Sequence, residues 1–134
     1  MASYTVVYHP DLHILFLRWL RPNTFAESQD SYAAALAERH ACTRWLLDGR
    51  RTGHIEVAET NWLANDFFPD AAARFAPHPL HLAVLSSPAR VEQVRTDPAV
   101  GPHVARALST ERPYRARVFT EEGPAVEWLA APPA

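Results

Sequence analysis

The stretch "TRWLLDGRRTGHIE", residues Thr43 to Glu56, is the part of the sequence that most directly indicates the fold class. Its first part, "TRWLLD", is short and mostly apolar, as is typical of a strand buried on both faces within a parallel sheet. Its second part, "GRRTG", places glycines around arginine and threonine, which favours a turn. We therefore expect a buried strand that ends at Asp48 and opens into a polar loop.

Two further strands are expected before this one. "SYTVVYH" (residues 3–9) is rich in β-branched and aromatic residues, and "HILFLRWL" (residues 13–20) is almost wholly apolar. The intervening "PDL" favours a turn, because Pro10 presets its own φ angle and Asp11 can bond its own backbone. We expect an antiparallel hairpin whose second strand lies inside a sheet covered on both faces.

A helix is expected after the hairpin. Thr24 followed three residues later by Glu27 has the spacing of a capping box, in which each side chain accepts a hydrogen bond from the backbone amide of the other residue. The helix should begin there and run to about Ala41. Its buried stripe is expected to comprise Phe25, Tyr32, Ala33 and Leu36.

The stretch "ETNWLANDFFPDAAARFA" (residues 59–76) predicts a second helix. Glu59 or Thr60 is expected near its start. Pro69 should end or kink it, because proline supplies no amide hydrogen and clashes with the preceding turn. The inward side chains are expected to be Trp62, Leu63 and Phe67.

The last third of the chain predicts two more strands and two more helices. A buried strand is expected over residues 80–86, and Ser87 before proline favours the start of a helix that is interrupted at "TDP" and leads to Leu108. "YRARVFT" (residues 114–120) alternates like a strand with one wet face. Thr120 is then expected to cap a closing helix.

The resulting order, β-β-α-β-α-β-α-β-α, places the chain in the α/β class. We expect a mixed, mostly parallel sheet of about five strands, with an N-terminal antiparallel hairpin and about four helices packed on it. The 134 residues suffice for one domain, which we assign to residues 1–131, with 132–134 as a frayed tail.

Composition excludes several classes of function. The net charge of −2 disfavours a nucleic-acid partner. The chain contains no lysine, which removes Schiff-base chemistry and a phosphate-binding lysine. Cys42, the single cysteine, suits a reducing cytoplasm, and no apolar run approaches the ~18 residues of a membrane span. We therefore expect a cytoplasmic protein without a membrane partner.

Four segments give the chain a family resemblance: "YTVVYHPDLHILFLRW" (4–19), "RWLLDGR" (44–50), "NWLANDFFP" (61–69) and "VFTEEGPAVEWL" (118–129). In this order they resemble the STAS domains (sulfate transporter and anti-sigma-factor antagonist), particularly the small stand-alone bacterial members. The resemblance implies an α/β sandwich that works by binding a partner protein, a regulatory nucleotide or a small apolar ligand.

The phosphorylated STAS domains carry a serine switch in an Asp-Ser-Ser-Gly-type segment. The matching region here reads "VAETNWLAND", where Thr60 is the only nearby hydroxyl and no glycine follows. A phosphate on Thr60 at a helix start would be electrostatically favourable. The alternative is that Thr60 simply caps the helix.

The candidate binding site lies where the strand ending at Asp48 meets its loop. Ligands of α/β sheets bind at the carboxyl ends of strands, and arginine can hold an anion through two parallel bonds. We assign ligand binding to Asp48, Gly49, Arg50, Arg51, Trp62 and Phe67. The alternative for the loop is that Asp48 caps it or pairs with an arginine while the other residues are solvated.

No residue pattern predicts a catalytic centre, a metal site or a cofactor. The histidine pairs His9/His13 and His78/His81 lack the third and fourth ligands that zinc requires. Two alternatives to a binding domain stay open. One is a small hydrolase or lyase that uses an inward histidine and a carboxylate, and the other is a purely structural, self-associating protein.

The large number of aromatic residues favours a protein–protein interface or a pocket. Four tryptophans, six phenylalanines and four tyrosines are many for this length, and such rings are enriched where proteins meet. In "NWLANDFF" they stand so close that one helix face does not obviously cover them all. We therefore expect a homodimer, or the mouth of a pocket, near this segment.

Overall fold

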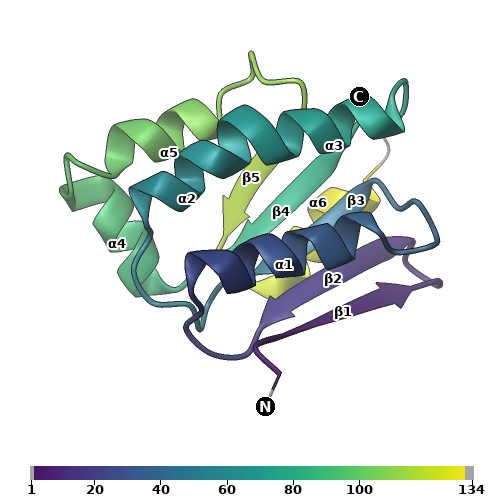
Figure 1. Cartoon of the computed structure of the whole chain (residues 1–134), viewed down its shortest axis with the longest axis horizontal. Helices are drawn as coiled ribbons and strands as arrows, with labels where there is room; N and C mark the ends of the chain where they lie inside the picture. The colour runs from purple at the N-terminus through teal and green to yellow at the C-terminus, as the bar shows by residue number, and fades with distance from the viewer. Residues whose placement is uncertain (1, 132–134) are drawn as a thin grey trace.

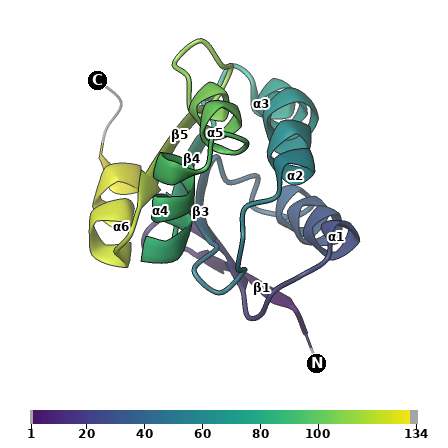
Figure 2. The same ribbon diagram turned by 90° about the vertical axis from the view of Figure 1, so that its left-hand side faces the viewer.

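The computed structural model of this protein describes residues 2–131; Met1 and residues 132–134, where a frayed tail was expected, lie outside the described residues. These residues form one five-stranded sheet with helices on both faces (Figures 1 and 2). The strands are β1 (Tyr4–His9), β2 (Ile14–Trp19), β3 (Arg44–Asp48), β4 (His81–Leu85) and β5 (Arg115–Phe119).

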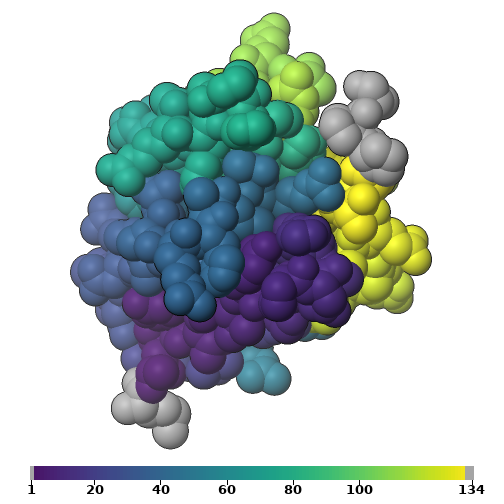
Figure 3. Space-filling model, turned by 90° about the vertical axis from the view of Figure 1, so that its right-hand side faces the viewer, coloured from purple at the N-terminus to yellow at the C-terminus, as the bar shows by residue number. Residues whose placement is uncertain are grey.

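The strands lie side by side in the order of the sequence, β1-β2-β3-β4-β5. β1 pairs antiparallel with β2, and every later pair is parallel. The predicted fold class is therefore confirmed: a mixed, mostly parallel sheet that begins with a hairpin. β1 is an open edge of the sheet; the N-terminal part of the chain reaches the surface in Figure 3, although Tyr4, Val6 and Tyr8 also pack against the core.

Five helices pack on this sheet within residues 2–131, if the continuous helical run from Val57 to Phe75 is counted once. α6 covers one face, and the helices that connect the parallel strands cover the other (Figure 2). The helical segments are α1 (Phe25–Leu36), α2 (Val57–Trp62), the π-helical segment η1 (Leu63–Phe67), α3 (Phe68–Phe75), α4 (Pro88–Thr96), α5 (Gly101–Ala107) and α6 (Glu122–Ala130).

The two faces of the sheet carry separate cores because successive strand residues point to opposite sides. Beneath α6, a smaller cluster includes Ile14, Leu46 and Ala83. Beneath α1 and α3, a larger cluster includes Trp45 and Leu82. β2 contributes buried side chains to both clusters, which confirms that it is covered on both faces.

The capping box at α1 is confirmed, because the Glu27 amide donates to Thr24 Oγ1 and the Thr24 amide donates to Glu27 Oε1. The helix ends at Leu36 rather than Ala41, which has a left-handed φ of 50° and cannot continue a helix. The predicted buried stripe is also wrong in part, since Phe25 is 40% exposed. Tyr32 is buried as predicted, and Ser28, Ser31 and Ala35 are buried with it.

Serines occupy this buried stripe because hydrogen-bond partners for their hydroxyl groups lie beside them. The Trp19 indole donates a 3.0 Å hydrogen bond to Ser31 Oγ, and the Ser31 hydroxyl donates to the Ser28 carbonyl. Asn23 Nδ2 donates to Ser28 Oγ. A hydrophobic pattern alone does not find a stripe whose buried members are hydrogen-bonded.

The helix expected to end or kink at Pro69 continues through it. The Phe68 amide donates to the Leu63 carbonyl, five residues back, so the chain widens into a π-helical turn just before the proline. This widening takes up the clash that a proline ring makes with an ordinary α-helical turn. The helix begins at Val57, so neither Glu59 nor Thr60 caps it.

The closing helix differs from expectation at its start. Glu121, not Thr120, occupies the capping position of α6, and no side chain there accepts a capping hydrogen bond. The start of α4 is as predicted, because Ser87 accepts a hydrogen bond from the Arg90 amide and Pro88 follows it. The break between α4 and α5 at "TDP" is confirmed as well.

Candidate functional site

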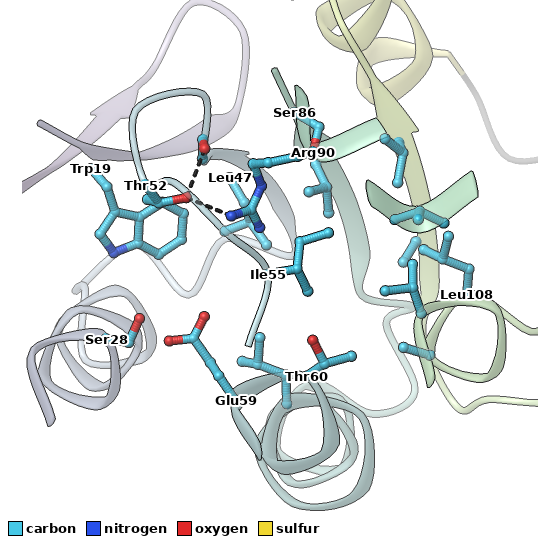
Figure 4. Close-up of a pocket in the computed structure, with 18 of the residues that line it drawn as sticks. Trp19, Ser28, Leu47, Thr52, Ile55, Glu59, Thr60, Ser86, Arg90 and Leu108 are labelled. Carbon is cyan, nitrogen blue, oxygen red and sulfur yellow. Dashed lines mark hydrogen bonds between the residues drawn. The ribbon is translucent and has the colours of Figure 1, made fainter. Parts of the chain in front are cut away.

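A cavity of about 310 Å³ lies between the sheet and the helices that connect its parallel strands (Figure 4). Leu47, Val84 and Val118, which lie in one row across β3, β4 and β5, form its floor with Ala116. Most of the lining is apolar. The cavity is partly open to solvent, so a ligand can enter without unfolding of the sheet.

The cavity sits at the carboxyl ends of the parallel strands. Trp19 ends β2, Gly49 follows β3 and Ser86 follows β4, and all three line it. Sheets of this type bind ligands in the crevice outside the carboxyl ends of their strands. The position is therefore the one that the topology favours for a binding site.

The space exists because α4 and α5 pack against other helices more than against the sheet. α5 lies against α2 and the π-helical segment, and α4 lies against α5. Gly101 permits the close approach of these two helices, since a Cβ atom there would stand 2.6 Å from the Val94 carbonyl oxygen. Val94 and Val104 then line the cavity instead of filling it.

Arg90 of α4 is the cation of the cavity lining. Its Nη1 donates to Thr52 Oγ1 at 2.8 Å (Figure 4) and to the Gly53 carbonyl at 2.9 Å. Its Nε is buried and has no hydrogen-bond partner among the described residues. Burial lowers the pKa of Arg90, although the charge of Glu59 and the Tyr32 side chain partly offset this effect.

Arg90 and Gln93 together attach α4 to the loop that follows β3. Gln93 Oε1 accepts from the Ile55 amide at 2.8 Å, and Gln93 Nε2 donates to the Ile55 carbonyl. Gly53 adopts a φ of +81° in this loop, a conformation that glycine tolerates readily. The loop is thereby held against α4, and Ile55 points into the cavity in Figure 4.

Other polar side chains of the lining include Tyr32, Glu59 and Thr60, together with Asn23, Ser28 and Ser86. Tyr32 is 5% exposed, and burial raises the pKa of its phenol, which therefore stays a hydrogen-bond donor. Glu59 and Thr60 come from α2, where Thr60 Oγ1 donates to the Glu56 carbonyl. Thr60 is thus a half-buried residue within a helix, and its phosphorylation stays a prediction.

The acid and the arginine of the predicted strand-end site engage each other. Asp48 is 7% exposed, and its two carboxylate oxygens accept from Arg50 Nε at 2.9 Å, Arg50 Nη2 at 2.8 Å and Arg18 Nη1 at 2.7 Å. Glu122 of α6 pairs with Arg18 in turn. This geometry agrees with the alternative reading of the loop, in which Asp48 pairs with an arginine.

The pKa of Asp48 reflects opposing effects. Burial alone would raise it, but hydrogen bonds from the Arg50 side chain and amide, and from Arg18, hold it below its usual range. Arg51 is exposed, whereas Gly49 is buried and lines the cavity. Of the four loop residues predicted to bind a ligand, the structure therefore places only Gly49 at the cavity.

Trp62 and Phe67 lie beside the cavity lining rather than in it. Their rings are 5.2 Å apart, and each contacts Tyr32. Both are half-buried against the core, while the neighbouring Phe68 is 6% exposed and lines the cavity. The expected roles of Asp48, Arg50, Arg51, Trp62 and Phe67 in ligand binding stay predictions.

The histidines lie away from this cavity, since all seven are among the described residues and none lines it. His40 pairs with Glu38 at 2.6 Å on an exposed turn, and His103 contacts Asn61. Within residues 2–131, no three histidine, cysteine, aspartate or glutamate side chains gather as a metal site would require. Over the same residues, each helix is too short or too polar to cross a bilayer.

Comparisons with known proteins give no match, whether with family models, curated proteins or solved structures. The site must therefore be interpreted from its own geometry. The residues that sequence reasoning missed are Arg90, Tyr32, Ile55 and the valines of α4 and α5. Tyr32 was expected only as a buried residue of its helix, and for Arg90 the sequence signal was the helix start at Ser87, three residues before it.

Proposed function

We propose that this protein is a non-enzymatic, STAS-like binding domain that takes up a small, largely apolar ligand in the cavity between its sheet and its connecting helices. The supporting observation is the cavity itself, about 310 Å³ in volume, mostly apolar and partly open at the carboxyl ends of the parallel strands. Small-molecule sites in proteins usually have these properties, including a few placed polar groups on an apolar wall.

The volume limits the size of the ligand. An engineered apolar cavity of about 150 Å³ holds benzene, which has six non-hydrogen atoms. A cavity of about 310 Å³ has twice that space. We therefore propose a ligand of about ten to twelve non-hydrogen atoms.

The other expectations from the sequence are weighed against this cavity. A histidine-dependent hydrolase would need a histidine in a cleft with a carboxylate, and the cavity lining contains Glu59 but no histidine. A purely structural protein would not need an apolar cavity that opens to solvent. A homodimer, a protein partner and a cytoplasmic location stay part of the proposal, the last because the chain contains only one cysteine, Cys42.

A thermal-shift screen tests the proposal. Small apolar compounds of the stated size should raise the melting temperature in a saturable way, because a ligand at 100 times its Kd stabilises the folded state by about 2.7 kcal/mol. Ala107→Phe should abolish the shift, since Ala107 of α5 lines the cavity. Ala105→Phe is the matched control, because Ala105 lies on the same helix and is exposed.

The two variants separate cavity binding from unspecific adsorption. If no compound shifts the melting temperature of the unmodified protein, the proposal is wrong. It is also wrong if Ala107→Phe and Ala105→Phe respond alike to every compound that binds.

A further inference from the structure

We propose that the ligand of this cavity is an apolar carboxylic acid whose carboxylate is held by Arg90. This inference rests on the proposed function and specifies the ligand class. The observation behind it is that some N–H groups of Arg90 form hydrogen bonds with the protein and others have no acceptor. A medium-chain or aromatic monocarboxylate has the charge, the polarity and the size that the cavity requires.

Among the described residues, only the Nη1 atom of the Arg90 guanidinium forms hydrogen bonds. Nη1 donates to Thr52 Oγ1 (Figure 4) and to the Gly53 carbonyl, and the two bonds fix the plane of the group. Nε is buried without a partner, and Nη2 donates to no side chain or backbone oxygen of the described residues. Nε and Nη2 form one edge of a guanidinium with two parallel N–H groups; Nε has almost no accessible surface, so a ligand oxygen reaches it only after a small shift of its neighbours.

A carboxylate matches this edge. Its two oxygens can accept both N–H groups at once, and such paired bonds are stronger and more directional than single ones. A buried N–H group without an acceptor costs free energy that a bound carboxylate would recover. The two Nη1 bonds hold the edge in place before any ligand arrives, which lowers the entropy cost of binding.

The charge of Arg90 supports the same conclusion. Arg18 and Arg50 each pair with a carboxylate of the chain within 4 Å. Arg90 forms no such pair within the described residues, although burial disfavours its charge. A partly buried cation without a counter-ion is unfavourable in an apolar wall, so a bound anion would complete the site.

The rest of the lining selects the remainder of the ligand. The floor of the cavity and its α5 side are aliphatic, with Leu47, Val84, Val104 and Leu108 among their residues. A phosphate would bring more oxygens than the free edge of Arg90 can satisfy in such surroundings. A single carboxylate on an apolar body needs only the two N–H groups of that edge.

The negative charge of Glu59 would repel an anionic ligand. This repulsion provides a second, independent test. It lines the cavity, and its charge acts on both Arg90 and Tyr32 without forming an ion pair within 4 Å. A carboxylate at Arg90 would feel its repulsion. Removing that charge should therefore strengthen acid binding, whereas a neutral ligand should be indifferent to it.

The first experiment compares decanoic acid with decanamide on the unmodified protein by isothermal titration at pH 7. The acid is expected to bind about tenfold to a hundredfold more tightly, which is the range for hydrogen bonds to a charged group. Equal binding of acid and amide would overturn the carboxylate proposal and leave the proposed function standing. Binding of neither compound would overturn both.

Variants then locate the preference. Arg90→Met should remove it by weakening acid binding at least tenfold with little effect on the amide, and Arg90→Lys should restore part of it. Gln93→Ala is the control, because it loosens the same loop at Ile55 without lining the cavity. If Gln93→Ala loses the preference as Arg90→Met does, Arg90 acts only by holding the loop, and the proposal is wrong.

Glu59→Gln provides the gain-of-affinity test. It should raise acid affinity about twofold to fivefold, a modest effect because the side chain is only partly buried, and it should leave amide affinity unchanged. Weaker acid binding in Glu59→Gln would contradict the placement of the carboxylate at Arg90. This test does not depend on whether Arg90→Met folds.

Discussion

Ala116→Leu is expected to stabilise the protein while it destroys ligand binding. Ala116 lies on β5 and forms part of the cavity floor. Leucine adds three carbon atoms, each worth about 0.8 kcal/mol when it is buried, and it loses about 0.5–1 kcal/mol of side-chain entropy. The free energy of unfolding should therefore rise by about 1.5 kcal/mol.

The same substitution on the opposite face of the sheet should have the opposite sign. Ala83 lies on β4, next to β5, and is fully buried beneath α6 with Leu46 and Leu129. Ala83→Leu therefore has to displace packed atoms. Overpacking of this kind costs about 1–3 kcal/mol. Both positions are strand alanines, so the difference between the variants reports the space around each.

Urea unfolding, followed by circular dichroism and extrapolated linearly to water, measures both values. A parallel thermal-shift titration should show that Ala116→Leu no longer responds to the ligands of the unmodified protein. If Ala116→Leu loses as much stability as Ala83→Leu, the space above β5 is already filled in solution. The cavity would then not exist, and the binding proposals built on it would have no basis.

Two predictions concern the parts of the fold that support the site. Asp48→Asn should cost about 1–3 kcal/mol at pH 7, because Arg18 and Arg50 lose a buried counter-ion. Since the folded-state pKa of Asp48 is lowered, this loss should be complete above its unfolded pKa of about 4 and shrink as the pH falls below that value. Urea midpoints between pH 7 and pH 2 measure it, and a pH-independent loss would contradict the ion pair. Thr24→Ala should cost about 1 kcal/mol by removing the acceptor of the Glu27 amide; no loss in the urea midpoint would mean that the cap adds nothing.

The sheet could be predicted from the sequence because its signals are local. β2 and β3 are short apolar runs, and their neighbours in the sheet are also their neighbours in the chain. The capping box at Thr24 is likewise read within four residues. Where an element depends on its own residues, the pattern and the structure agree.

The cavity could be predicted in position but not in composition. The rule that parallel strands bind ligands at their carboxyl ends pointed to the loop after β3, and Gly49 of that loop does line the cavity. Arg90 comes from a helix about 40 residues later, and only the crossing of α4 over the loop brings it to Thr52. A contact of that kind is set by packing between helices, which no local pattern encodes.

The errors along the helices have the same origin. The buried stripe of α1 was misassigned because Ser28 and Ser31 are buried through hydrogen bonds to other elements. The start of the second helix was placed too late because no side chain caps Val57. In both cases the tertiary partner, rather than the local propensity, decides the outcome.

The π-helical turn at Leu63–Phe67 has a consequence for how this protein tolerates changes of length. Each residue of an α-helix turns the chain by about 100°. The turn holds one residue more than an α-helical turn, so removing one residue from it would restore an α-helical turn and leave the orientation of α3 nearly unchanged. A deletion in the α-helical part of the run would instead rotate the residues after it by about 100° and carry Phe68 away from the cavity and Ala71 away from the core.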